Sequence, residues 1–321
     1  MAKWEPEKIR LGVSACLLGD EVRYDGGHKR DAFLTDTLGP FVEWVRVCPE
    51  VEVGLGVPRP PIRLVGDATA PRLVVEKTGE DLTARMQRWA RRRAAELAAL
   101  GLHGYVLKKS SPSCGLFRVR VHGEGRGMPG GAGRGLFAAA LVEALPSLPI
   151  EEEGRLTDAG LREAFIERVF GAARWQAFTA ARPRARDLVA FHAAHKLTVL
   201  AHSPRDYAAL GRIVAGAGAR GIGDVVERYG ETFQRALAVR ATRARHANVL
   251  QHLAGFFKPQ LADDERAELM EVIEDYRRGL VPLVVPITLI KHHVRRLGIA
   301  YLADQVYLNP HPRELMLRNH V

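Results

Sequence analysis

Three cysteines carry the most informative chemistry in this sequence. Cys16, Cys48 and Cys114 are the only cysteines among 321 residues, and an odd number cannot close entirely into disulfides within one chain. A thiol can bind a soft metal, exchange disulfides, or pack as a small apolar group. The separations of 32 and 66 residues match no zinc finger or ribbon, whose ligands come in close pairs, and the sequence has no C-x-x-C redox motif.

The neighbours of the cysteines favour a site that the fold assembles. Each cysteine stands in turn residues that follow a short apolar run, and these runs are residues 11–14, 41–47 and 104–107. Each run predicts a strand, and the carboxyl ends of strands are where open α/β sheets build their sites. Thiols gathered there would suit an iron–sulfur cluster with one iron free of protein ligands. A zinc ion with an open position and simple burial are the alternatives.

The elements around these runs predict an α/β domain followed by an all-helical domain. In the first half, helical patterns at 31–38, 81–100 and 136–145 alternate with the apolar runs, to which 117–121 and 148–150 are added. Later apolar spacings of three and four predict helices at 160–181, 187–214, 221–252, 263–280 and 286–297. We expect a largely parallel sheet with crossover helices in 1–155, a helical linker in 156–190 and an all-α domain in 191–321.

Charge favours a polyanionic partner. The chain holds 47 Lys and Arg against 37 Asp and Glu, for a net charge of +10, and nucleic acid is the commonest partner of such a protein. The excess is concentrated in residues 181–260, with 13 basic and 5 acidic residues. There Arg240, Arg243 and Arg245 are expected to form a basic strip along one helix that contacts RNA phosphates, unless they are simply solvated.

The glycine-rich segment, the histidines and the N-terminal residues give weaker indications. Residues 123–135 lack the features of a P-loop or a dinucleotide fingerprint, but Arg126 and Arg134 could make this segment a flap that touches phosphate. Histidines of the helical half have no metal-ligand spacing. No membrane span or signal peptide is evident, so we expect a cytoplasmic protein.

The residues around the cysteines resemble those of the thiouracil desulfidase family, formerly a domain of unknown function. The matching motifs are Ser14–Gly19 with Val22–Gly26, Val47–Glu50, and Leu107–Lys108 with Ser111–Gly115. The helical half resembles a second uncharacterised domain that is found fused to it, through His195–Lys196, Leu200–Ser203 and Leu289–His293. The arrangement looks like that of two-domain desulfidases that act on thiolated uridine in tRNA.

By that resemblance, Cys16, Cys48 and Cys114 would bind a [4Fe–4S] cluster. The remaining iron would take the sulfur of 4-thiouridine or 2-thiouridine, and oxygen would replace sulfur without net redox change. Glu50 would be the base that activates water, and Ser111 would donate or relay a proton to the pyrimidine. The simpler interpretations are a loop carboxylate bound to backbone N–H groups and a turn serine.

The resemblance also frames the expected substrate and partners. Arg23, Asp25, Lys108 and Lys109 flank the first and third ligands and would contact phosphate or the uracil edge, although solvated charge is the alternative. Thiolated tRNA is the expected partner, and the helical domain would help to present it. Two other functions remain open: a desulfidase of free thiouracil whose helical domain serves oligomerisation, and a metal-containing RNA-binding module without catalysis.

Overall fold

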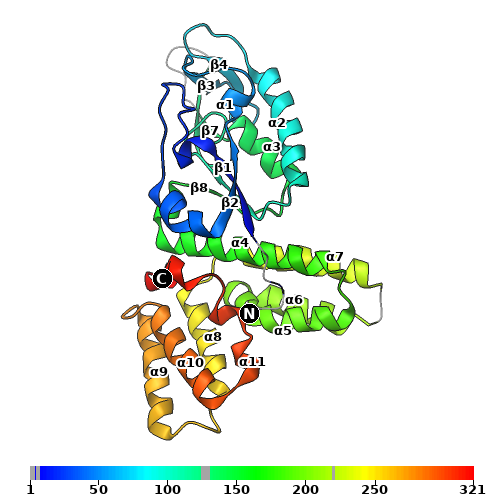
Figure 1. The fold of residues 1–321 in the computed structure, drawn as a ribbon, viewed down its shortest axis with the longest axis vertical. Coiled ribbons are helices and arrows are strands. Elements are labelled where there is room, and N and C mark those ends of the chain that lie inside the picture. Colours follow the sequence, from blue (N-terminus) through cyan, green and yellow to red (C-terminus); the bar gives the residue numbers. More distant parts are fainter. Residues whose placement is uncertain (1–3, 5–7, 124–130, 219–220) are drawn as a thin grey trace. The chain divides into compact units, whose positions relative to one another are not determined.

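The computed structural model describes Trp4 and residues 8–123, 131–218 and 221–321. The chain divides into two compact units, Lys8–Thr157 and Asp158–Val321, and Trp4 belongs to the second, where its ring packs against Phe178 and Phe191. The first unit combines strands and helices, and the second is built of helices (Figure 1). The predicted fold class is therefore confirmed.

A parallel four-stranded sheet positions the cysteines. Its strand order is β2-β1-β5-β8, and the strands are β1 (Ile9–Ser14), β2 (Val42–Val47), β5 (Gly104–Leu107) and β8 (Ile150–Glu152). Ser14 pairs with Val47, and Leu107 pairs with Glu152, the last residues of their strands. The segments that leave β1, β2, β5 and β8 therefore emerge along one edge.

Two helices cover this sheet as the sequence predicts, α2 (Thr83–Ala99) and α3 (Leu136–Ala144). Their apolar faces meet at Tyr105 of β5, where Phe137 lies 6.0 Å from the Tyr105 ring and Trp89 lies 5.4 Å from Phe137. Gly12 of β1 permits this packing, because a Cβ there would come within 2.1 Å of the Tyr105 ring. The burial of these aromatic rings fixes the strand that leads to Cys114.

The sequence does not predict the second sheet of this unit, although the run expected at 117–121 overlaps one of its strands. Its order is β4-β3-β6-β7, with β3 (Ile62–Val65), β4 (Arg72–Val75), β6 (Val119–His122) and β7 (Gly131–Gly133). Only β3 and β6 are parallel; the other two pairs are antiparallel. The other three strands are too short to show a clear alternation, and β7 is built largely of glycine.

Shorter elements link these strands. The helix expected at residues 31–38 is a π-helix over Phe33–Leu38, and α1 (Pro49–Glu52) is a single turn. The remaining short turns of this unit are 3-10 turns over Ala15–Leu18, Gly39–Phe41 and Arg155–Thr157.

The second unit is helical throughout. Its helices are α4 (Ala159–Ala180), α5 (Ala185–His202), α6 (Pro204–Ala215), α7 (Ile222–Leu237), α8 (Arg243–Gly255), α9 (Asp263–Arg278), α10 (Val284–Leu297) and α11 (Ala300–Ala303). Three 3-10 turns follow, over Val306–Leu308, Arg313–Leu315 and Leu317–Asn319. Helix α4 occupies most of the segment expected to be a linker. In the described residues, no helix combines the length and apolar character needed to cross a bilayer.

Two expected helices are each divided in two. Ser203 caps α6 by accepting a hydrogen bond from the Asp206 N–H, and Pro204 follows it. Thr242 caps α8 in the same way through the Arg245 N–H, while α7 has already ended at Leu237. Arg240 therefore lies between helices, and the expectation of one helical strip with Arg243 and Arg245 is wrong. Local capping chemistry outweighs the continuous apolar spacing.

A buried charge cluster ties the end of the chain to α4 and α5. The Arg318 Nε lies 3.0 Å from Glu163 Oε1, and Arg318 Nη2 lies 3.5 Å from Glu167 Oε1. His202 Nε2 approaches Glu167 Oε2 at 3.0 Å. Although burial raises the pKa of Glu167, His202 and Arg318 outweigh it and hold this pKa well below the usual range.

We expect Arg318→Met to destabilise the helical unit by about 3–5 kcal/mol, because it leaves two buried carboxylates without their guanidinium partner. Denaturant unfolding of the full chain, followed by hydrogen exchange of α4, measures the effect. Arg313→Met is the control: its side chain is 91% exposed and pairs with the exposed Glu314, so no measurable change is expected. Equal effects of the two substitutions would contradict a stabilising role for the cluster.

Candidate functional site

The carboxyl edge of the parallel sheet brings the three cysteines to one cavity. Cys16 lies in the 3-10 turn after β1, Cys48 caps α1 directly after β2, and Cys114 lies in the loop after β5. All three line a cavity of about 510 Å³, here named the cysteine cavity. Residues that are 98 positions apart along the chain thus share one site, because parallel strands end at a common edge.

Burial controls the charge state of these thiols. It raises the pKa of Cys16 to about 11, with neighbouring Cys48 adding to the shift, and it also raises the pKa of Cys48. The pKa of Cys114 is raised well above its usual value by the same cause, although a hydrogen bond with Ser14 opposes the shift. Burial therefore favours neutral thiols, and a bound metal centre would supply the positive charge that favours thiolates.

The three thiols share the lining of one cavity. Within the described ranges, no group of three His, Cys, Asp or Glu side chains is gathered closely enough to hold a metal ion. The donor set is nevertheless three soft sulfurs on one cavity, which suits iron–sulfur chemistry. The donor chemistry of these residues therefore fits an iron–sulfur cluster held by three thiolates.

Glu50 faces the cysteine cavity and is held from two sides. Its Oε2 accepts hydrogen bonds from Arg59 Nη2 at 2.6 Å and Nε at 2.9 Å, and its Oε1 accepts one from Ser113 Oγ at 2.8 Å. The side chain is 14% exposed, so this ion pair is shielded from bulk water. The carboxylate is fixed by side chains, which differs from the simpler interpretation of a loop carboxylate that binds backbone N–H groups.

Arg59 is a site residue that the sequence analysis missed. Besides Glu50 it binds two carbonyls, Gly56 O at 2.8 Å and Val22 O at 2.9 Å, and it is buried. It thereby joins the loop after Cys16 to the helix after Cys48. The sequence shows only an arginine within the P-R-P-P segment at 58–61, and its burial could not be read from that segment, because arginine is mostly exposed unless it is paired.

On the expectation that Glu50 is the base of a desulfuration, Arg59→Met should lower kcat by at least about tenfold while KM changes less, because a misplaced Glu50 carboxylate loses its alignment. Iron content and unfolding temperature report whether the fold survives. Arg59→Lys should restore part of kcat, since it keeps a positive charge but not the two-pronged contact. Arg85→Met is the control: Arg85 also binds this loop, through Gly54 O, but it does not contact Glu50. Full activity of Arg59→Met would contradict the positioning role.

The loop before Cys114 supplies both the serine and the lysines. Ser111 lines the cysteine cavity, and its Oγ accepts hydrogen bonds from the Ser113 and Cys114 N–H groups at 3.2 and 3.1 Å. The serine therefore shapes the turn that presents the third cysteine, as its simpler interpretation proposed, and it also faces the cavity. Its hydroxyl proton is not engaged by either contact, because the oxygen is the acceptor in both.

Glu153 anchors the two lysines of this loop. Its Oε1 lies 2.5 Å from Lys108 Nζ, and its Oε2 accepts a hydrogen bond from the Lys109 N–H at 2.7 Å. Both lysines line the cysteine cavity. Glu153 follows β8 directly and was missed by the sequence analysis, although the run of three glutamates at 151–153 after an apolar strand was visible.

Of the two site residues expected in the loop after Cys16, one lines the cysteine cavity and the other does not. Arg23 lines the cysteine cavity, with its Nε 3.4 Å from Asp25 Oδ1. Asp25 is exposed and does not line the cavity; its Oδ1 accepts the Gly27 N–H at 3.1 Å, and this bond is the main cause of its lowered pKa. The structure therefore places Asp25 in a turn that orients Arg23.

The arginines expected to contact RNA lie in several places. Arg126 is outside the described residues. Arg134 lines a separate pocket of the α/β unit, described below. In the helical unit Arg240 and Arg243 line a pocket of about 280 Å³, and Arg245 Nη1 donates to His202 O at 2.7 Å.

The fold and site thus define a class: an α/β domain with a thiol-lined cavity at the carboxyl edge of its parallel sheet. Comparison with known proteins agrees. A family model described as 2-thiouracil desulfurase matches residues 11–153, and one described as a protein of unknown function (DUF1722) matches residues 196–312. The α/β unit belongs to the 2-thiouracil desulfurase family, and the helical unit carries the DUF1722 domain.

Individual proteins are also similar to this chain. The uncharacterized protein YbgA of Escherichia coli K12 is 35% identical over 133 residues, which are 41% of this chain and 79% of that protein. The uncharacterized protein YbbK of Bacillus subtilis 168 is 32% identical over 108 residues, 32% of this chain and 71% of that protein. A solved structure described as the [4Fe-4S]-dependent thiouracil desulfidase TudS is 35% identical, spans 48% of this chain and 97% of that chain, and has a TM-score of 0.40.

Proposed function

We propose that this chain is a [4Fe–4S]-dependent desulfidase that converts thiolated uridine in tRNA to uridine. The observation that carries the proposal is the meeting of Cys16, Cys48 and Cys114 on one cavity that Glu50 also lines. Membership in the 2-thiouracil desulfurase family supports the reaction type. The overall change replaces C=S and water by C=O and hydrogen sulfide, so no oxidant or reductant is needed.

Cys16, Cys48 and Cys114 would hold the cluster, one thiolate to an iron. When bound, such a cluster offers one iron without a protein ligand, a Lewis acid that binds sulfur and polarises a C=S bond. Loading the site deprotonates the three thiols and releases their protons, because the ligands are thiolates. Cys114 is buried in the hydrophobic core of this unit, which keeps bulk water away from that ligand.

Glu50 would take a proton from the attacking water. Both of its oxygens already accept hydrogen bonds, but each carboxylate oxygen has a further lone pair, so a water in the cavity can still be bound. Arg59 and Ser113 prevent the carboxylate from rotating away, which reduces the reorganisation needed at the moment of reaction. Glu50 is therefore the base and Arg59 its positioning residue.

Other residues that line the cavity would bind and protonate the pyrimidine. Among the described residues no group accepts the Ser111 hydroxyl proton, so it is available for a ring nitrogen or the exocyclic atom, and Lys108, Lys109 and Arg23 provide positive charge on the same cavity. Arg126, Arg134, Arg240, Arg243 and Arg245 stay in this proposal as contacts to RNA phosphates. Their charge supports a nucleic-acid substrate over a free base, which carries no phosphate.

Anaerobic reconstitution followed by product analysis tests the function. Full-length protein is loaded with iron and sulfide and incubated with thiolated tRNA, the corresponding thiouridine nucleoside and free thiouracil. Mass spectrometry of the released nucleosides measures conversion to uridine. Highest kcat/KM on tRNA is the expected result. A higher kcat/KM on free thiouracil would make the free base, and not tRNA, the substrate. No conversion of any substrate by iron-loaded protein would contradict the proposed desulfidase activity.

A further inference from the structure

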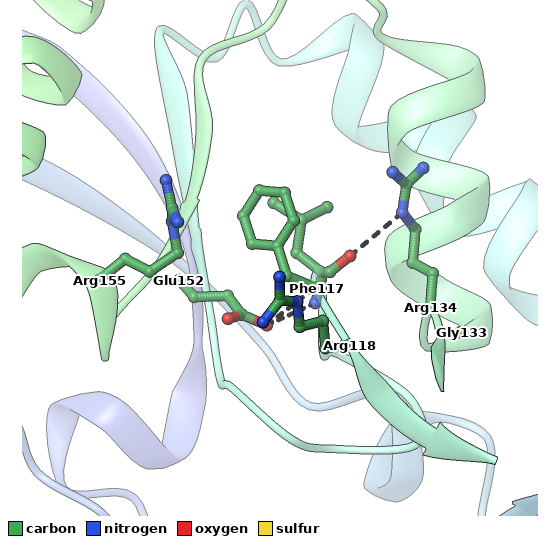
Figure 2. A pocket seen from close by; sticks show the side chains of 7 residues that line it. Phe117, Arg118, Gly133, Arg134, Glu152 and Arg155 are labelled. Carbon is green, nitrogen blue, oxygen red and sulfur yellow. Dashed lines mark hydrogen bonds between the residues drawn. The ribbon is translucent and has the colours of Figure 1, made fainter. Parts of the chain in front are cut away.

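A second pocket of the α/β unit collects three arginines and an exposed aromatic ring. It has a volume of about 700 Å³, and we name it the arginine pocket. Its lining residues are Leu116, Phe117, Arg118, Gly133, Arg134, Glu152 and Arg155. Figure 2 shows the Phe117 ring between the side chains of Arg155 and Arg134. Three guanidinium groups against one carboxylate make the lining positive.

Much of this positive charge is available to a ligand. Within the described part of the chain, Arg118 forms no hydrogen bond or ion pair, and Arg134 forms a bond to Leu116 O through Nε alone, at 3.3 Å. Arg155 Nε binds Glu151 Oε1 at 2.8 Å, which leaves its two terminal nitrogens for other acceptors. The single lining carboxylate, Glu152, is buried and accepts the Leu116 and Phe117 N–H groups at 2.7 and 3.1 Å.

The arginines surround a flat surface that suits a nucleobase. Phe117 is 42% exposed, and the Arg155 guanidinium lies 4.8 Å from its ring centroid. Exposed aromatic rings flanked by arginine are the usual platform for unpaired bases, because every base has a face that stacks. The backbone of Arg118 has a φ of 50°, which residues other than glycine rarely adopt. The hydrogen bonds from the Leu116 and Phe117 N–H groups to Glu152 hold the turn that precedes it.

The arginine pocket and the cysteine cavity are built on the same two segments. Cys114 lines the cavity, while Leu116 and Phe117, two and three residues later, line the pocket. Glu152, the last residue of β8, accepts the Leu116 N–H of the pocket. The next residue, Glu153, binds the two lysines of the cavity. Because Cys114 and Leu116 are only two residues apart along the chain, the two sites lie near enough for neighbouring nucleotides of one strand to enter them.

We propose that the arginine pocket binds the phosphate backbone and an unpaired base of the RNA whose thiolated uridine enters the cysteine cavity. This inference rests on the proposed function and extends it, because it assigns RNA docking to the α/β unit itself. Arg118, Arg134 and Arg155 contact phosphates, and Phe117 stacks on a neighbouring base. Such contacts position the RNA without reading its sequence.

Binding of an RNA hairpin without any thiolated base tests the inference separately from catalysis. Fluorescence anisotropy of the labelled hairpin is measured with full-length, iron-loaded wild type and with the triple variant R118Q/R134Q/R155Q. The triple variant should weaken binding by at least about tenfold and reduce the slope of log Kd against log salt by about 2, since each lost single-strand phosphate contact removes about 0.7. Phe117→Ala should weaken binding while leaving that slope unchanged, because stacking releases no counterions.

A matched triple variant controls for net charge. Arg88, Arg91 and Arg92 are exposed on α2 and line neither site, so R88Q/R91Q/R92Q removes the same charge from the same unit. It should bind the hairpin like wild type. Equal weakening by the two triple variants would show that RNA is attracted by the net charge of the protein and not bound at the arginine pocket. Unchanged binding by R118Q/R134Q/R155Q would contradict the proposed site directly.

Competition and turnover identify the ligand class. Unlabelled RNA should displace the hairpin far better than uridine monophosphate or polyglutamate; equal displacement by either would overturn RNA in favour of a mononucleotide or an acidic peptide. With thiolated RNA, the pocket variant should raise KM, so that kcat/KM for RNA falls relative to that for free thiouracil. Failure of wild type to desulfurise RNA that it binds through the pocket would contradict the proposed function and leave the docking site standing.

Discussion

Cys114→Ser is expected to remove bound iron and abolish turnover. Cys114 is the most deeply buried of the three thiols, at 5% exposure, and it alone belongs to the loop that also carries Ser111 and the lysines. A hydroxyl is a harder and far less acidic ligand than a thiol, so it does not replace thiolate at an iron–sulfur cluster. Iron analysis and the visible spectrum after anaerobic reconstitution, followed by product analysis, measure the loss.

The control for this substitution is Ala94→Ser. Ala94 is fully buried in α2, so the same hydroxyl is introduced into the core of the same unit, away from the cysteine cavity. That variant should retain iron and turnover. Serine at Cys16 or Cys48 should act as at Cys114, because each cysteine would serve a different iron. Wild-type iron content and activity in Cys114→Ser would remove Cys114 from the proposed ligand set.

Glu50→Gln is expected to keep iron and lower kcat by about 10²–10⁴-fold, the usual contribution of a general base. Glutamine has nearly the same shape and can still accept from Ser113, but it cannot take a proton from water. The comparison of iron content with single-turnover rates separates catalysis from cluster assembly. A loss of iron equal to the loss of rate would instead make Glu50 a residue that stabilises the cluster loop.

Glu43→Gln provides the matched control for Glu50. Glu43 lies on β2, the strand that leads to Cys48, and its carboxylate pairs with Arg10 at 3.3 Å on the exposed surface. Glu43→Gln removes the same charge from the same strand–helix segment as Glu50→Gln, but Glu43 does not line the cysteine cavity. Wild-type kcat is expected for this variant. Normal turnover in Glu50→Gln would show that another group activates the water.

Much of the candidate site was predictable because it depends on strand ends. Short apolar runs before Cys16, Cys48 and Cys114 indicated parallel strands, and parallel strands place their carboxyl ends together whatever the intervening chain does. The partners of Glu50 were not predictable in this way. Arg59 belongs to a loop, and its contact with Glu50 depends on loop conformation, which leaves no periodic signal in the sequence.

Helix boundaries and charge partners show the same limit. Continuous apolar spacing predicted one helix across 221–252, but the helices end at Leu237 and restart at Arg243, because the Thr242 cap satisfies the first N–H groups of α8. Arg318 meets Glu163 across 155 positions, and local composition does not encode such a pair. Likewise, the arginine pocket required Arg118, Arg134 and Arg155 to converge from separate segments.

By itself, the amino-acid order determined that this protein has an α/β half and a helical half, and that three thiols follow strand ends. Those properties arise from local periodicity and turn chemistry, which act over a few residues. Only the tertiary structure decided which side chains face the cysteine cavity, that Asp25 does not, and that Arg59 and Glu153 hold the groups that do. The physical reason is that side-chain contacts between distant loops depend on packing, and packing depends on the whole fold.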